Sequence, residues 1–198
     1  MQILEIKKFN LQGSILDMGS KKSPLNVTNY IKSNNRITYL DKYSNISKDL
    51  KVDLEKEYSD SENIKFNNVI LMNVLEHIYN YQNCMNICNF FLKKKGIILG
   101  STPFYFQVHG SPNDYFRYTS EALILILKKS GFYEIEIKVL AGGIFICFFN
   151  SISRITQKLL FLNNIIFVTC QLLDFILSLF SKNLKLKFPL GYFFKGKK

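Results

Sequence analysis

The sequence predicts an α/β protein built on a doubly wound, mostly parallel sheet. Short apolar segments alternate with helical segments along the chain, several of them end in Asp or Gly, and no internal repeat interrupts the pattern. Hydrophobic residues make up 47% and charged residues 21% of the 198 residues, which is enough apolar side chain to bury a core. We therefore expect residues 1–198 to form a single domain.

Six segments are expected to form strands, because buried parallel strands read as short, continuous apolar runs. The second and third of these segments carry the acids Asp41 and Asp53 at or near their ends, and the first is followed by Gly19. In chain order the segments cover residues 14–18, 36–41, 51–54, 68–72, 97–101 and 133–139.

Helices are expected between some of these strands. Gly96 is placed to cap the end of the second helix, since glycine commonly follows the last helical residue. Either Thr119 or Ser120 can cap the start of the third. The three expected helices cover residues 24–33, 81–94 and 120–131.

Polar side chains follow the strands at one end of the expected sheet. In such sheets the ligand lies beyond the carboxyl ends of the strands. An acid after the second strand, here Asp41, is placed to accept hydrogen bonds from ribose hydroxyls, and an acid one strand further out, Asp53, can accept from an adenine amino group. Together with Asp17 and Asn73 they indicate an adenosine-containing cofactor.

The charge of the chain is concentrated in its last third. Of the formal net charge of +11, residues 1–138 contribute +4 and residues 139–198 contribute +7, with Asp174 the only acid in the second part. A basic segment favours an anionic partner, which is a membrane surface or a nucleic acid. Because only three residues are Arg, the usual reader of base edges, we favour the membrane. The alternative is that these lysines only keep an apolar segment soluble.

The cysteines and histidines exclude several classes of protein. The four cysteines lie among apolar neighbours, which is typical of buried thiols in a reducing compartment. With two histidines in the chain and no carboxylate cluster, no metal site is expected.

No apolar segment follows a basic start near Met1, so the sequence shows no secretory signal. We therefore expect a cytoplasmic protein, with the inner face of the membrane as the alternative.

Residues 144–185 form an apolar insertion before the final segment. Within it, residues 159–180 would make a helix about 33 Å long, enough to span a bilayer. Its polar residues, however, fall on one stripe of a helical projection, which is typical of a helix that lies on a surface. That surface is the protein's own sheet, a partner or a membrane. The stripe consists of Asn163, Asn164, Gln171, Asp174 and Ser178.

A series of motifs resembles a known family. The segments ILDMGSKKSP (15–24), NVILMNVLEHI (68–78), HGSPNDYFRYTSEALILILKKSGF (109–132) and PLGYFFKGKK (189–198) are similar to those of class I S-adenosylmethionine-dependent methyltransferases. The small enzymes of bacterial surface-polysaccharide biosynthesis are the most similar of these. The resemblance implies a seven-stranded Rossmann-like sheet, whose last strand runs antiparallel between the fifth and sixth and follows a helical insertion.

The resemblance also implies a set of cofactor-binding residues. Asp17 and Gly19 would lie beside the methionine part of S-adenosylmethionine, Asp41 would bind the ribose, and Asp53 and Leu54 would hold the adenine. The full implied set is Asp17, Gly19, Ser20, Asp41, Lys42, Asp53, Leu54, Asn73, Val74 and His77.

One position departs from the family pattern. The first loop usually reads Asp-x-Gly-x-Gly, and Lys21 stands where the second glycine is expected. Glycine there lets the backbone approach the ligand without a clash. The departure leaves open a catalytically degenerate relative that serves as a binding or partner subunit. A nicotinamide dehydrogenase is disfavoured, because Gly19 is the only glycine in residues 14–35.

The expected chemistry is metal-independent methyl transfer to a hydroxyl of a sugar or lipid-linked glycan, a substrate class that the resemblance alone implies. His109 is the candidate base, because an imidazole titrates near neutral pH, and Asp114 is the second catalytic candidate. Alternatively His109 contacts the substrate or bonds a backbone carbonyl. Tyr115, Arg117 and Tyr118 are candidate substrate contacts, although Arg117 and Asp114 could simply pair and brace their loop.

Overall fold

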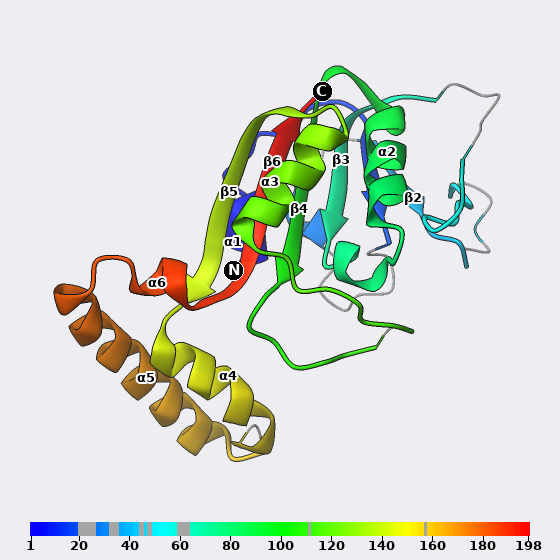
Figure 1. The fold of residues 1–198 in the computed structure, drawn as a ribbon. Coiled ribbons are helices and arrows are strands. Elements are labelled where there is room, and N and C mark those ends of the chain that lie inside the picture. Colours follow the sequence, from blue (N-terminus) through cyan, green and yellow to red (C-terminus); the bar gives the residue numbers. More distant parts are fainter. Residues whose placement is uncertain are drawn as a thin grey trace.

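The protein folds around one six-stranded sheet with the strand order β2-β1-β3-β4-β6-β5 (Figure 1). The computed structural model describes residues 1–19, 27–31, 36–43, 46, 49–58, 64–110, 112–156 and 158–198. The strands are β1 (Ile15–Met18), β2 (Ile37–Leu40), β3 (Phe66–Met72), β4 (Leu92–Pro103), β5 (Tyr133–Gly142) and β6 (Pro189–Lys197).

The strand directions confirm the expected topology. The first four strands run parallel, whereas β6 runs antiparallel between β4 and β5. Phe194 of β6 is fully buried and pairs with Gly100 of β4 on one side and Ile137 of β5 on the other. A Cβ on Gly100 would lie 2.1 Å from the Cζ of Phe194, so the glycine provides the space that this ring fills.

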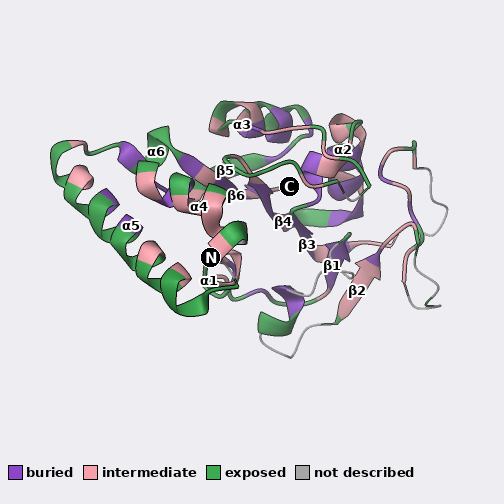
Figure 2. Ribbon diagram, turned by 90° about the horizontal axis from the view of Figure 1, so that it is seen from below, coloured by how far each residue is buried: buried purple, intermediate pink, exposed green. Residues whose placement is uncertain are grey.

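Helical segments cover both faces of the sheet, as the doubly wound interpretation predicts. Side chains alternate between the faces of a strand, so Leu16 packs into one core and Ile15 into the other. All four cysteines are buried free thiols, which confirms their expected place. One face carries α2 (Tyr81–Phe91) and α3 (Ser120–Lys129), and the other carries α1 (Gln2–Ile6) and the 3₁₀ turn η1 (Val27–Tyr30) (Figures 1 and 2).

The expected strand at residues 51–54 is absent, so the sheet has six strands rather than seven. Leu50 makes only an isolated parallel bridge to Leu40, with its N–H donating to the Tyr39 carbonyl at 2.8 Å. Beyond that bridge the chain leaves the edge of the sheet. Val52 and Leu54 are nevertheless buried, which explains their apolar character without a strand.

Two of the expected helices also differ. α2 ends at Phe91 instead of residue 94, and Gly96 lies inside β4 instead of capping the helix. The sheet competes for this segment, because the N–H of Lys95 donates to the carbonyl of Lys198 and the N–H of Lys198 donates to the carbonyl of Gly96. Of the expected helix at residues 24–33, the structure describes residues 27–31, and residues 27–30 form the 3₁₀ turn η1; the other half of the expected helix lies outside the described residues.

The expected helical insertion forms a hairpin that projects from the sheet (Figure 1). It consists of α4 (Ile144–Thr156) and α5 (Leu160–Phe180), and α6 (Leu184–Lys187) leads back to β6. The buried carboxylate of Asp174 on α5 accepts hydrogen bonds from the N–H groups of Phe145 and Ile146, at 3.0 and 2.8 Å. Asp174 thereby turns inward and caps the start of α4, which fixes one helix to the other.

The hairpin leaves a broad apolar surface exposed to solvent. Of the polar stripe expected on α5, Asn163 and Asp174 turn toward α4, whereas Asn164 and Gln171 are exposed. The protein's own sheet therefore does not cover the apolar face, contrary to one of the alternatives drawn from the sequence. The large exposed apolar residues of α5 are Leu160, Phe161, Leu162, Ile165, Phe167, Val168, Leu172, Leu173, Phe175, Ile176, Leu179 and Phe180.

Candidate functional site

A cleft of about 1080 Å³ lies at the carboxyl ends of β1, β2 and β3, where the topology predicts a ligand. Asp17, Asp114, Arg117 and Tyr118 do not line it, and Ser20 lies outside the described residues, as does Lys21. The site residues expected from the sequence that do line it are Gly19, Asp41, Lys42, Asp53, Leu54, Asn73, Val74, His77, His109 and Tyr115.

The floor of the cleft is formed where β1 ends. Asp17 is buried within β1, and Gly19 follows with a φ of +79°, a conformation that favours glycine. A Cβ on Gly19 would lie 3.0 Å from Cγ2 of Val74, which lines the same cleft. Glycine is thus required here both by the backbone and by the close approach of the turn after β3.

One wall of the cleft is acidic and comes from the ends of β2 and the segment after it. The carboxylate of Asp41 accepts a hydrogen bond from the N–H of Tyr43 at 2.8 Å. Lys42 Nζ lies 4.0 Å from a carboxylate oxygen of Asp53, and the buried side chain of Leu54 adds an apolar surface beside this pair. This combination of acceptors and apolar surface suits a nucleoside, with ribose hydroxyls at Asp41.

Glu55 is a wall residue that the sequence analysis missed. Its carboxylate accepts hydrogen bonds from the N–H groups of Tyr79 and Asn80, at 2.7 and 2.9 Å. Glu55 thereby connects the acidic wall to the start of α2, and Asn80 in turn caps that helix through the N–H of Asn83. Its sequence signal, one more acid in VDLEKE, does not distinguish it from its neighbours Asp53 and Glu57.

Asn73 occupies the point where β3 ends. Its φ is +52°, a conformation that Asn tolerates better than most residues. The side-chain carbonyl oxygen accepts from Gln2 Nε2 at 2.7 Å and from Ser101 Oγ at 3.0 Å. With its oxygen occupied, the amide nitrogen of Asn73 is the group left to donate to a ligand.

The loop between β4 and α3 is braced by an ion pair. Arg117 donates from both terminal nitrogens to the carboxylate of Asp114, at 2.5 and 2.6 Å, and Asp114 also accepts from the N–H of His109 at 2.8 Å. The guanidinium of Arg117 therefore holds the pKa of Asp114 well below its usual range. This is the bracing alternative of the sequence analysis, and it fixes where His109 lies.

The two candidate tyrosines of this loop lie in different surroundings. Tyr115 lines the cleft and its ring meets that of Tyr79 at 5.4 Å between centroids. Tyr118 is buried, its hydroxyl donates to the carbonyl of Leu75, and burial raises its pKa. Tyr118 therefore belongs to the core beneath α3, whereas Tyr115 can touch a ligand.

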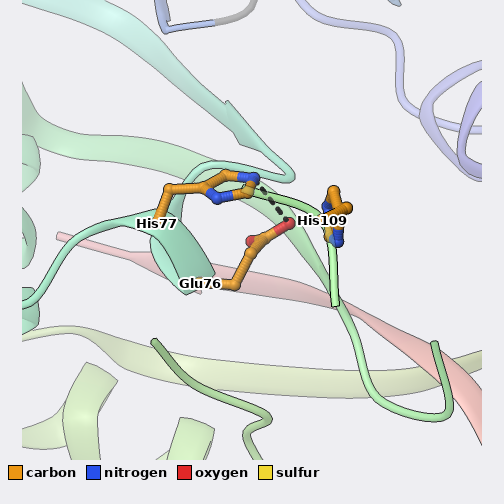
Figure 3. A group of neighbouring side chains, drawn as sticks. All are labelled: Glu76, His77 and His109. Carbon is orange, nitrogen blue, oxygen red and sulfur yellow. Dashed lines mark ion pairs between the residues drawn. The ribbon is translucent and has the colours of Figure 1, made fainter. Parts of the chain in front are cut away.

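Three titratable side chains gather at the edge of the cleft (Figure 3). Glu76 and His77 come from the 3₁₀ turn η2 (Leu75–His77) after β3, and His109 comes from the loop after β4. Burial raises the pKa of Glu76 to about 8, with the charge of Asp114 adding to the effect. The two imidazole rings lie 4.9 Å apart between centroids, so the loop brings together residues 32 positions apart in the sequence.

A second, smaller cavity of about 350 Å³ adjoins the cleft. Four residues line both, namely Gln2, Val27, Asn73 and His109. The smaller cavity also reaches Thr102 on β4 and Asn150 on α4. Thr102 Oγ1 is buried behind the cavity wall and makes no hydrogen bond within the described part of the chain. Two adjoining cavities with His109 between them can hold two reactants side by side.

Searches among protein-family models and among curated proteins found no match to this chain. Solved structures do match. A methyltransferase from Archaeoglobus fulgidus that depends on S-adenosylmethionine is 16% identical over 98% of this chain and 90% of its own, with a TM-score of 0.57. The chain has the class I methyltransferase fold.

Two further matches show the breadth of this fold. Phosphoethanolamine N-methyltransferase 2 of Haemonchus contortus, in complex with S-adenosylmethionine, is 17% identical to this chain, with a TM-score of 0.57. The match covers 100% of this chain but 52% of the Haemonchus protein, so this chain spans about half of its length. The cyclase SpnF is 12% identical over 99% of this chain and 78% of its own, again with a TM-score of 0.57. The fold is therefore common to different reactions, and the chemistry has to be argued from the site.

Proposed function

We propose that this protein is a methyltransferase that uses S-adenosylmethionine to methylate a hydroxyl of a sugar or lipid-linked glycan at a membrane surface. The observation that carries the cofactor is the cleft at the carboxyl ends of β1–β3, which Asp41, Leu54 and Asn73 all line. These are the groups that a ribose, an adenine and a methionine moiety require, and the solved structures with this fold include complexes with S-adenosylmethionine.

The smaller cavity supports the presence of an acceptor beside the cofactor. Methyl transfer from a sulfonium is an in-line displacement, so the protein must align acceptor and methyl group and exclude water. An acceptor in the smaller cavity would meet the cleft at Asn73 and His109. The partly exposed Asn150 offers a polar contact to a hydroxyl-bearing acceptor, and the His109 imidazole is the candidate group to take its proton.

The hairpin supports the membrane as the place of the reaction. Phe161, Phe175 and Leu179 of α5 are 81%, 62% and 67% exposed, far more apolar surface than isolated surface residues leave. The exposed charged residues of the hairpin and the segments beside it are basic. The one acid of residues 139–198, Asp174, is buried and caps α4. An apolar face with basic neighbours is typical of a helix that binds anionic lipid. The exposed lysines of this segment are Lys158, Lys182, Lys185 and Lys187.

A hairpin that lies in the interface fits these helices better than one that spans the bilayer. By length and composition α5 is the one helix among the described residues that could cross a membrane. However, α4 has 13 residues, about 20 Å as a helix, whereas a bilayer core is about 30 Å thick. Since α4 is fixed to α5 and lines the smaller cavity through Asn150, the hairpin would bring that cavity to the lipid surface.

Calorimetric titration with S-adenosylmethionine and S-adenosylhomocysteine tests the cofactor. We expect micromolar binding that Asp41→Ala abolishes and the exposed, distant Glu121→Gln leaves unchanged. No binding by folded wild-type protein would overturn the enzyme assignment, and the degenerate binding subunit would replace it.

Sedimentation with vesicles tests the membrane. We expect binding to vesicles that contain phosphatidylglycerol, and loss of that binding in the double variant Phe175→Asp with Leu179→Asp. The matched control, Asn164→Asp with Gln171→Asp, adds the same charge to exposed polar positions of α5. Wild-type protein that stays wholly in the supernatant, or equal loss in both double variants, would contradict an apolar contact with lipid.

A further inference from the structure

Glu76 is a buried carboxyl group without a counter-charge at hydrogen-bond distance. Its side chain is 0% exposed, and within the described part of the chain neither carboxylate oxygen makes a hydrogen bond. The nearest basic group is His77, whose Nε2 lies 3.8 Å from Glu76 Oε1. A buried carboxyl is costly to ionise unless it is paired or bound to a cation, so this group calls for a partner.

The two histidines are held with one nitrogen occupied and the other free. His77 Nδ1 lies 2.5 Å from the carbonyl oxygen of Asn113, and His109 Nδ1 lies 3.2 Å from that of Gln107. A carbonyl oxygen only accepts, so each Nδ1 carries the proton and each Nε2 keeps its lone pair. His109 Nδ1 is also 3.2 Å from a carboxylate oxygen of Asp114. Metal-binding histidines are oriented in this way, by a carbonyl or a carboxylate behind the ring.

We propose that Glu76, His77 and His109 form a binding site for a divalent first-row transition metal ion, with Zn²⁺ as its probe. One ligand atom from each residue lies within 4.8 Å of the others, and the Glu76 carboxylate lies between the two rings (Figure 3). Two imidazoles and one carboxylate are the ligands of catalytic zinc sites, whereas Mg²⁺ and Ca²⁺ prefer oxygen alone. Because His77 and His109 line the cleft, an ion bound by them would lie at the edge of the cleft.

An ion at this site would join two separate elements of the cleft wall, the turn after β3 and the loop after β4. This inference departs from the expectation of a metal-free protein, which followed from having only two histidines, because the fold brings both of them to one carboxylate. Its role in the reaction rests on the proposed function. There the ion would lower the pKa of an acceptor hydroxyl, the hydroxyl proton would pass to solvent water, and His109 would serve as a ligand instead of the base.

Titration of Zn²⁺ into chelator-treated full-length protein without a tag tests the site. We expect one ion per chain. Glu76→Gln should weaken binding by at least about 100-fold, and Asp114→Asn, which removes the carboxylate behind His109, by about 10- to 100-fold. Glu121→Gln, an exposed acid on α3, should bind as wild type does. If Glu76→Gln does not fold, His109→Asn on the partly exposed loop takes its place.

The two histidines also give a direct signal. In an NMR spectrum of the imidazole nitrogens, one equivalent of Zn²⁺ should shift the Nε2 resonances of both rings. Failure of the folded wild type to bind Zn²⁺, binding that leaves both imidazoles unchanged, or equal affinity in wild type and His109→Asn would overturn the proposal. These measurements need no S-adenosylmethionine, so failure of the proposed function would show in the cofactor titration and leave the zinc result standing.

Discussion

Gly19 and Val74 approach closely at the cleft floor, since a Cβ on the glycine would lie 3.0 Å from Cγ2 of the valine. Gly19 follows β1 and Val74 follows β3, the neighbouring strands whose carboxyl ends lie at the cleft. The floor therefore depends on a backbone conformation that only glycine adopts readily.

Gly19→Ala should weaken S-adenosylhomocysteine binding by about tenfold, equivalent to about 1.4 kcal/mol, because the new methyl group displaces Val74. Calorimetry measures the effect. Gly131→Ala is the matched control, since Gly131 has a similar φ of +82° but lies in the turn after α3. Both variants should lose about 1–2 kcal/mol of stability through backbone strain. Equal affinities in the two variants would contradict the role of the Gly19 contact in the cleft.

Asp174→Ala should destabilise the hairpin by about 1 kcal/mol, because it removes the acceptor for the first N–H groups of α4. Limited proteolysis between α4 and α5 should then be faster than in wild type. The control is Ser178→Ala, whose hydroxyl bonds only the Phe175 carbonyl of its own helix. Unchanged proteolysis of Asp174→Ala would show that the cap does not hold the hairpin together.

Thr119→Ala should lower the free energy of unfolding by about 1 kcal/mol, because Thr119 Oγ1 caps α3 by accepting from the N–H of Ala122 at 3.2 Å. Denaturant unfolding measures the difference. Ser120→Ala removes a neighbouring hydroxyl that bonds the Glu121 side chain instead of a helix N–H group, and it should cost less than Thr119→Ala. A larger loss of unfolding free energy in Ser120→Ala than in Thr119→Ala would contradict the assignment of Thr119 as the cap.

The Asp114–Arg117 pair should make stability depend on acid pH. The pKa of Asp114 is lowered in the folded protein, chiefly by the hydrogen bonds from Arg117, and is about 3.9 in the unfolded chain. The stabilisation is therefore complete above about pH 5, decreases as the pH falls below the unfolded-state pKa, and is lost by the time the pH falls through the lower folded-state pKa. Between pH 5 and pH 2 wild type should lose about 1–3 kcal/mol more than Asp114→Asn, measured by urea unfolding. Parallel pH profiles would contradict the pairing.

Much of the cleft could be predicted from the sequence, because the carboxyl ends of parallel strands meet at one edge of a sheet. That rule places Asp41, Asp53 and Asn73 at one edge, and all three line the cleft. The strand prediction was wrong at residues 51–54. The sequence KVDL does not distinguish a strand from an extended segment that buries its apolar side chains. Leu54 reaches the cleft in either case.

The relationships that sequence could not supply depend on burial and on the path of loops. Glu76 lies between Val74 and His77, which the sequence analysis includes among the candidate site residues. The sequence does not show, however, that the Glu76 carboxyl is buried and makes no hydrogen bond within the described residues. The meeting of His77 and His109 depends on the course of the loop that Asp114 and Arg117 brace. The inward turn of Asp174 likewise depends on how α4 meets α5.

The place of β6 also sets an order of events during synthesis. Among the described strands, β5 pairs with β6 alone, and the 46 residues between these two strands include the whole hairpin. Because chains fold as they emerge from the ribosome, N-terminal part first, the apolar hairpin emerges while β5 is still an unpaired edge. A nascent chain in this state exposes the apolar hairpin before β6 has completed the sheet. A chaperone or a lipid bilayer therefore meets the hairpin at that stage.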